Sequence, residues 1–160
     1  MSVAFRRDSD EEHLEPRFEI PIPAGPNLVT AVGMIATEAA VARLGAEAAL
    51  LESGQPPDDV QLGVIKRELR YWRTRLATAM IAPPPPNGEV AFGARVVFLL
   101  NGAQRTVDIV GDDEADPANG RIAFSAPLAR AMMGAGVGDL ADFAGRADAI
   151  EILDVAAIPG

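Results

Sequence analysis

The chain lacks cysteine entirely and has a single histidine, His13, among its 160 residues. Disulfides therefore cannot hold the fold, and a zinc site has neither thiolates nor an imidazole cluster to form it. No apolar run approaches the roughly 18 residues that a membrane-spanning helix needs, and the first residues lack the apolar stretch of a secretory signal. These absences predict a cytoplasmic protein with no membrane partner, no metal and no cofactor.

Basic charge and aromatic residues are also scarce. The formal net charge is −9, and aromatic residues make up 5% of the chain. Phosphate backbones repel an acidic surface, which argues against general coating of nucleic acid, and no sequence-specific DNA readout is expected. His13 lies in a polar, acidic stretch that offers nothing to hold it against a nucleophile or a carboxylate. The composition therefore favours a binding protein over an enzyme.

Residues 1–27 combine six acidic side chains with three arginines and the run PIPAGP. Such a segment has little to pack, so we predict a flexible acidic arm. A helix follows Thr30, its predicted N-cap. One face of this helix carries residues spaced by three and four: Met34, Thr37, Val41, Leu44, Ala48 and Leu51.

A second amphipathic stretch runs from Asp58 to Ile81 and has the spacing of a heptad seam. The members of the seam are Leu62, Ile65, Leu69, Trp72, Leu76 and then Ala79 or Met80. Between the two stretches, Gly54 and the prolines at 56 and 57 end the first helix. Two apolar stripes joined by a short turn predict an antiparallel helical hairpin, a coiled coil, over residues 28–82.

Four consecutive prolines at 83–86 predict an extended linker over residues 83–87. The pattern then becomes β-like, with runs at 94–100 and 105–110 around Asn101-Gly102, a strong hairpin turn signal. Further strands are predicted at 121–125, 140–143 and 149–155, and one short helix at 127–133. The predicted fold class is α+β: the helical hairpin, then a small antiparallel β-domain over residues 88–160.

Five basic residues lie within ten positions of the second helix: Lys66, Arg67, Arg70, Arg73 and Arg75. Two interpretations stay open. The strip is either a solvated face whose long stems cover the seam, or a confined site for a polyanion such as a nascent RNA end. In the second interpretation the contacts are Lys66, Arg67, Arg70 and Arg73.

Asp58 and Asp59 are paired carboxylates at the expected hairpin tip. Exposed acidic pairs can bind a hard cation such as Mg²⁺, although such a site normally needs further ligands. An aspartate at a helix start also accepts backbone N–H bonds and complements the positive end of the helix dipole. We expect capping, and no metal site is assigned.

Three stretches resemble the Gre transcription elongation factors. IVGDDEADPANGRIAFSAPLARAMMGAGVGD, residues 109–139, is similar to the C-terminal domain of that family, and NGEVAFGARV, residues 87–96, is similar to the entry to that domain. RYWRTRLATAMI, residues 70–81, resembles the end of the family's second helix. The resemblance implies a domain folded like an FK506-binding protein that docks on the rim of the secondary channel of bacterial RNA polymerase, with the hairpin pointing inward.

The implied docking residues form two segments: Asp112, Asp113, Glu114 and Asp116, then Ser125, Pro127, Leu128 and Arg130. Ala126 stands where the family usually has a serine, which removes one polar contact. In this picture the basic strip would face the channel or the RNA.

The hairpin tip departs from the family's cleavage factors, which carry a Gly-Asp-x-x-Glu-Asn stretch whose acids help hold a catalytic magnesium ion. The turn here contains Asp58 and Asp59 instead. We therefore expect a polymerase-binding elongation regulator without an intact cleavage tip. The alternatives are transcript cleavage stimulated through these two aspartates, or regulation of nucleoside diphosphate kinase as in the related Rnk proteins; the low aromatic content disfavours prolyl isomerisation.

Overall fold

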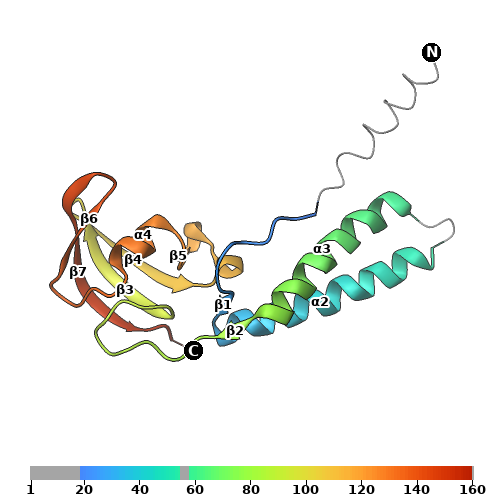
Figure 1. Ribbon diagram of the computed structural model, residues 1–160, viewed down its shortest axis with the longest axis horizontal. Helices are drawn as coiled ribbons and strands as arrows, with labels where there is room; N and C mark the ends of the chain where they lie inside the picture. Colours follow the sequence, from blue (N-terminus) through green and yellow to red (C-terminus); the bar gives the residue numbers. More distant parts are fainter. Residues whose placement is uncertain (1–18, 55–57, 160) are drawn as a thin grey trace, which may run out of the picture.

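The computed structural model describes residues 19–54 and 58–159, and consists of a helical hairpin and a β-domain at opposite ends of an elongated molecule (Figure 1). The hairpin comprises α2 (Ala31–Glu52) and α3 (Asp59–Thr78). This arrangement confirms the predicted α+β class. His13 and the prolines at 56 and 57 lie outside the described residues.

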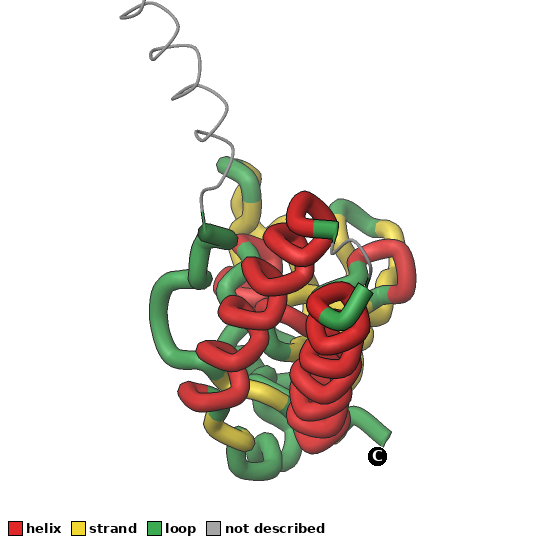
Figure 2. Tube along the Cα trace, turned by 90° about the vertical axis from the view of Figure 1, so that its right-hand side faces the viewer, coloured by secondary structure: helices red, strands yellow, loops and turns green. Residues whose placement is uncertain are grey.

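The two helices lie side by side along the hairpin (Figure 2) and bury the predicted seam between them. Leu44 and Ala48 of α2 pack against Ile65 and Leu69 of α3. The partly buried residues around this cluster are Val41, Leu51, Leu62 and Trp72. The predicted cap is also confirmed, because the Thr30 hydroxyl accepts a hydrogen bond of 3.0 Å from the Gly33 amide.

The second helix is shorter than predicted. It ends at Thr78, and β2 (Met80–Ile81) then pairs in parallel with β1 (Leu28–Val29). The Met80 amide donates to the Asn27 carbonyl at 2.9 Å, so the chain segments entering and leaving the hairpin satisfy each other's backbone groups. The heptad pattern continues through Met80, which is why periodicity alone extended the helix too far.

The β-domain is built on one five-stranded sheet. Its strands are β3 (Ala94–Leu100), β4 (Ala103–Val110), β5 (Arg121–Ala123), β6 (Leu140–Phe143) and β7 (Arg146–Ala157), in the order β5-β4-β3-β7-β6. Asn101 and Gly102 form the predicted β3–β4 turn and both have positive φ, 51° and 85°. One pairing corrects the prediction of an antiparallel sheet, since β5 lies parallel to β4.

The loop between β4 and β5 makes that parallel pairing possible. It contains two short 3₁₀ helices, η1 (Asp112–Glu114) and η2 (Pro117–Asn119), which return the chain to the same end of the sheet. A short helix, α4 (Pro127–Met132), follows β5. The acidic residues between β4 and β5 therefore belong to a folded connection.

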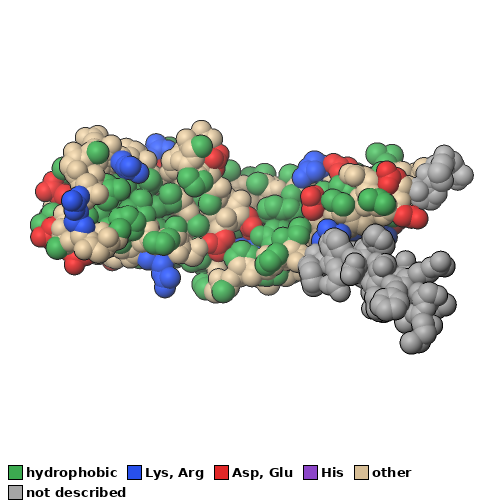
Figure 3. Space-filling view, turned by 90° about the horizontal axis from the view of Figure 1, so that it is seen from above, with side chains coloured by type: hydrophobic (Ala, Val, Ile, Leu, Met, Phe, Trp, Pro, Cys, Tyr) green, Lys and Arg blue, Asp and Glu red, His purple; other side chains and the backbone are tan. Residues whose placement is uncertain are grey.

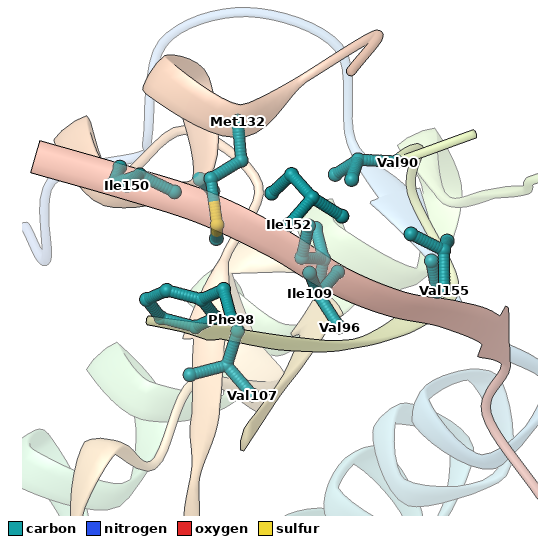
Figure 4. Close-up of a cluster of buried hydrophobic side chains, with 11 residues drawn as sticks. Val90, Val96, Phe98, Val107, Ile109, Met132, Ile150, Ile152 and Val155 are labelled. Atoms are coloured by element: carbon teal, nitrogen blue, oxygen red, sulfur yellow. The ribbon is translucent and has the colours of Figure 1, made fainter. Parts of the chain in front are cut away.

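The core of the β-domain lies between the sheet and α4 (Figure 4). Phe98 of β3 and Ile150 of β7 are completely buried, and Met132 of α4 points into the same cluster. The other labelled members are Val90, Val96, Val107, Ile109, Ile152 and Val155. This core is separate from the hairpin seam, so each part has its own apolar interior.

Within the described ranges, no helix combines the length and apolar character needed to cross a membrane.

Candidate functional site

The hairpin is held on the β-domain by a buried ion pair. Arg75 of α3 places its Nε 2.6 Å from Oδ2 of Asp113 in η1. The Arg75 side chain is 2% exposed and the Asp113 side chain 13%. Breaking such a pair would leave a charge buried without its counter-ion, so it fixes the position of α3 on η1.

A second carboxylate of the same loop anchors the start of α2. Oε2 of Glu114 accepts hydrogen bonds from the Thr30 amide at 3.1 Å and from the Gly111 amide at 3.0 Å. The Thr30 hydroxyl donates to Oε1 of Glu114. The positive end of the α2 dipole therefore faces a carboxylate that belongs to the other part of the molecule.

Asn27 and Tyr71 complete the junction. Buried Asn27 donates through Nδ2 to the Arg75 carbonyl at 2.8 Å and to the Thr78 hydroxyl at 3.2 Å. The Tyr71 hydroxyl donates to Oδ1 of Asp113. Asp113 is thus shared by two side chains of α3, and the end of the predicted flexible arm is a packed segment.

Tyr71 makes the junction observable by titration, because it is the single tyrosine. Partial burial, followed by the hydrogen bond to Asp113 and its charge, raises the pKa of Tyr71 from 10 to about 12. We expect absorbance of the phenolate near 295 nm to appear with a midpoint near pH 12, and Asp113→Asn to lower it.

The same shift makes stability depend on pH in a defined window. The folded pKa of Tyr71 is raised, so its stabilising contribution is complete below the unfolded pKa near 10 and is lost as the pH rises toward 12. A midpoint near pH 10 in folded wild-type protein would contradict the described contact with Asp113.

The two predicted docking segments lie next to each other. The Ser125 hydroxyl donates to Oδ1 of Asp112, which joins η1 to the start of α4. Ser125, Pro127 and Arg130 are exposed, and Leu128 is partly buried against the core. Asp113 and Glu114, by contrast, are engaged in the junction with the hairpin.

Asp116 also has intramolecular partners. Its Oδ2 lies 2.7 Å from Nδ2 of Asn119 and 3.2 Å from Nη2 of Arg121. The resemblance implied that these acids act together in docking. In the structure, Asp113 and Glu114 instead contact the hairpin, and Asp116 contacts Asn119 and Arg121. The surface that η1 and α4 can offer to another molecule is centred on Asp112, Ser125, Pro127 and Arg130.

The basic strip is also divided. Arg75 is buried and therefore does not belong to the exposed strip. Lys66 lies 2.9 Å from Glu52 of α2, and Arg70 binds Glu19 through two nitrogens. Arg73 is exposed and Arg67 is partly exposed. Figure 3 shows basic and acidic side chains gathered together on the hairpin half of the molecule.

The hairpin tip has the predicted cap. Oδ1 of Asp58 accepts a hydrogen bond of 3.0 Å from the Gln61 amide, and Asp59 is the first residue of α3. No group of three or more acidic or histidine side chains able to hold a metal is present in the part of the chain that the structure describes.

Sequence reasoning missed Arg75, Tyr71 and Asn27 as junction residues. Arg75 was predicted to belong to the basic strip. Only its position beside the seam residues Trp72 and Leu76 indicated that it could be buried. Asn27 was assigned to the arm. No local pattern marks these residues, because their partners lie 38 to 51 positions away in the sequence.

These contacts define a class of protein in which a β-domain carries a helical hairpin through a junction of hydrogen bonds and one buried ion pair. Residues 85–157 match the family model described as "Transcription elongation factor, GreA/GreB, C-term". Over these residues the chain is similar to the C-terminal domain of the GreA/GreB transcription elongation factors.

Individual proteins named GreA and GreB are similar to part of the chain. The chain is 53% identical over 53 residues to transcription elongation factor GreA of Chelativorans sp. (strain BNC1), covering 32% of this chain and 34% of that protein. It is 38% identical over 86 residues to GreA of Methylococcus capsulatus, covering 51% and 54%. It is 40% identical over 79 residues to GreB of Neisseria meningitidis serogroup B, covering 47% and 48%. The matches thus span a third to a half of these relatives.

Solved structures are also similar. A crystal structure of Thermus aquaticus Gfh1 matches 84% of this chain and 100% of its own length, with 22% identity and a TM-score of 0.39. The GreA/GreB structure from Nitrosomonas europaea matches 83% and 99%, with 18% identity and a TM-score of 0.38.

Proposed function

We propose that this chain is a bacterial RNA-polymerase-binding regulator of transcription elongation, which acts by docking rather than by catalysis. The proposal rests on the similarity of residues 85–157 to the GreA/GreB C-terminal domain. It also rests on the hydrogen bond from Ser125 to Asp112, which joins the two segments predicted to dock. The β-domain would anchor at the rim of the secondary channel, and the hairpin would extend inward from it.

The geometry of the junction supports this division of labour. Arg75 and Asp113 fix α3, while Glu114 fixes the start of α2, so both helices are held on the docking domain. A hairpin held in this way can be directed into a channel when its carrier domain binds the rim. The hairpin could then alter elongation or pausing, or occlude the channel, without chemistry of its own.

The tip supports a role without stimulated cleavage. The Asp58 carboxylate accepts an amide hydrogen bond at the start of α3, so it is already used as a cap. Neither Asp58 nor Asp59 belongs to a cluster of three acidic side chains within the described residues. Two carboxylates alone make a poor Mg²⁺ site.

The test uses the full chain and bacterial core RNA polymerase. We expect Ser125→Glu combined with Arg130→Glu to weaken binding at least about tenfold, or ~1.4 kcal/mol, because these substitutions introduce like charge beside Asp112. Arg146→Glu, at the start of β7, is the matched control and should bind as wild type does. Equal binding by all three proteins would refute the docking surface.

The same complexes test the role of the tip. On a backtracked complex, wild-type protein should stimulate little cleavage beyond that of polymerase alone, and Asp58→Asn with Asp59→Asn should change neither cleavage nor binding. Robust Mg²⁺-dependent cleavage that disappears in the double variant would instead establish the cleavage-factor alternative.

A further inference from the structure

Three of the four asparagines in the chain are followed directly by glycine: Asn87, Asn101 and Asn119. An Asn-Gly pair can react with itself, because glycine has no side chain to keep its amide nitrogen away from the amide group of the asparagine. The three pairs share this chemistry but differ in what holds the two reacting groups in the fold.

The reaction needs no co-reactant except water. The glycine nitrogen attacks Cγ of the asparagine, a succinimide ring closes through the new C–N bond, and Nδ2 leaves as ammonia with the proton that the glycine nitrogen loses. Water then opens the ring at either carbonyl, which gives aspartate or isoaspartate. For the ring to close, the backbone must rotate until the glycine nitrogen faces Cγ. Hydrogen bonds that hold either group elsewhere therefore slow the reaction.

Both reacting groups of the pair at 119 are held. Nδ2 of Asn119 donates to Oδ2 of Asp116 at 2.7 Å, and the Gly120 amide donates to the Pro117 carbonyl at 3.1 Å. Asn119 is also the last residue of η2. Ring closure here requires the side-chain contact and the 3₁₀ turn to open first.

The backbone of the pair at 101 is held by the sheet. Asn101 begins the two-residue turn between Leu100 and Ala103, which pair across β3 and β4. Its amide also donates to the Ala149 carbonyl of β7 at 2.8 Å. Rotation about the backbone of Asn101 would break this bond and open the end of the β3–β4 ladder.

The pair at 87 is free of such contacts. Asn87 and Gly88 are exposed and lie in the segment between β2 and β3 (Figure 1). In the described part of the chain, neither the Asn87 side chain nor the Gly88 amide has a hydrogen-bond partner. Pairing resumes only at Val90, whose amide donates to the Ala135 carbonyl at 2.8 Å.

We propose that Asn87 is a site of spontaneous deamidation, and that the folded chain forms isoaspartate there in preference to the other two Asn-Gly pairs. The product carries a new carboxylate and one additional carbon in the backbone of the linker between the hairpin and the β-domain. The junction contacts of Arg75 and Glu114 do not involve Asn87, so the change affects the covalent connection and not these contacts.

The site also implies a class of enzyme partner. Isoaspartyl carboxylates are methylated by enzymes that use S-adenosylmethionine, and such an enzyme must bind the peptide segment around the modified residue. An exposed segment without hydrogen-bond partners can be bound in this way without unfolding the β-domain. This inference goes beyond docking on polymerase and does not depend on it.

The sequence makes the three sites separable in one experiment. The full chain is incubated at mildly alkaline pH, and cleavage after arginine then places the three asparagines in different peptides, residues 76–95, 96–105 and 106–121. Mass spectrometry follows the conversion of amide to acid in each peptide. We expect Asn87 to convert at least about tenfold faster than Asn101 or Asn119, because the other two react only after local opening.

A second measurement identifies the product. Incubated protein is treated with a purified isoaspartyl methyltransferase and labelled S-adenosylmethionine, and we expect the label in peptide 76–95. Asn87→Gln is the matched variant, because it keeps an amide side chain that is one carbon longer and closes the ring poorly. It should remove both the conversion and the label from this peptide and leave the other two peptides unchanged.

Unfolded protein separates the effect of the fold from that of neighbouring residues. In guanidinium chloride we expect the three asparagines to convert at rates within about threefold of one another, since the hydrogen bonds that distinguish them are lost. Conversion of Asn101 or Asn119 as fast as Asn87 in the folded chain would overturn the proposal. The same preference for Asn87 in the unfolded chain, or no methyl label in peptide 76–95, would overturn it as well.

Discussion

Arg75→Met is expected to destabilise the folded protein by about 3–5 kcal/mol, since it removes one partner of a buried ion pair and leaves the Asp113 carboxylate without its counter-charge. Methionine preserves much of the apolar stem, so the loss reports the charge rather than a cavity. Urea unfolding followed by the fluorescence of Trp72, the single tryptophan, would report on the hairpin.

Arg73→Met is the matched control for this experiment. Arg73 lies two positions away on the same helix but is exposed, so its substitution should change the unfolding free energy by less than about 0.5 kcal/mol. A second variant, Arg75→Met with Asp113→Leu, removes both charges and should recover part of the loss. Equal stability of the Arg75 and Arg73 variants would mean that the ion pair does not hold the junction.

The hairpin itself was predictable from the sequence. The heptad spacing of α3 identified Ile65 and Leu69 as buried, and the spacing of α2 identified Leu44, because a 3.6-residue period brings these side chains to one face. The caps at Thr30 and Asp58 were also local, since each lies three residues before the amide it accepts. Predictions from local sequence patterns of this kind hold where no contact with a distant segment imposes a different structure.

The junction was not predictable, because it depends on pairing between distant segments. β1 and β2 are two residues each, too short for any alternation to show. Arg75 has the same sequence context as its exposed neighbours, and only the arrival of Asp113 makes its burial possible. The parallel pairing of β5 with β4 likewise depends on the path of η1 and η2 between the two strands.

The candidate site was predicted in part for the same reason. The resemblance selected both docking segments, but it could not indicate that Asp113 and Glu114 face the hairpin while Ser125 and Arg130 face solvent. Asp113 and Glu114 face the hairpin because Gly33 and Gly111, which have no side chains, allow the hairpin and the β-domain to approach closely. The space for a side chain at Gly33 is filled by the Glu114 carboxylate, and at Gly111 it is filled by the Leu28 carbonyl oxygen and by Oε2 of Glu114.

Gly111→Ala should separate the hairpin from the β-domain. Gly111 has φ −71° and ψ 164°, extended backbone that alanine also adopts, so no conformational strain is introduced. A Cβ at this position would instead collide with the Leu28 carbonyl oxygen and lie 2.8 Å from Oε2 of Glu114. The carbonyl belongs to β1 and cannot move as a side chain does, so we expect a loss of about 3 kcal/mol, the upper end of the usual cost of overpacking.

The local effect of Gly111→Ala is best followed by hydrogen exchange. The amides of Thr30 and residue 111 both donate to Glu114 and should lose protection, while Phe98 in the β-domain core should keep it. Gly63→Ala is the matched control: its Cβ would project into open space on α3, and the better helix propensity of alanine should stabilise the protein by about 0.5–1 kcal/mol. Unchanged exchange at Thr30 in the Gly111 variant would show that the close approach of β1 to η1 is not what holds the two parts together.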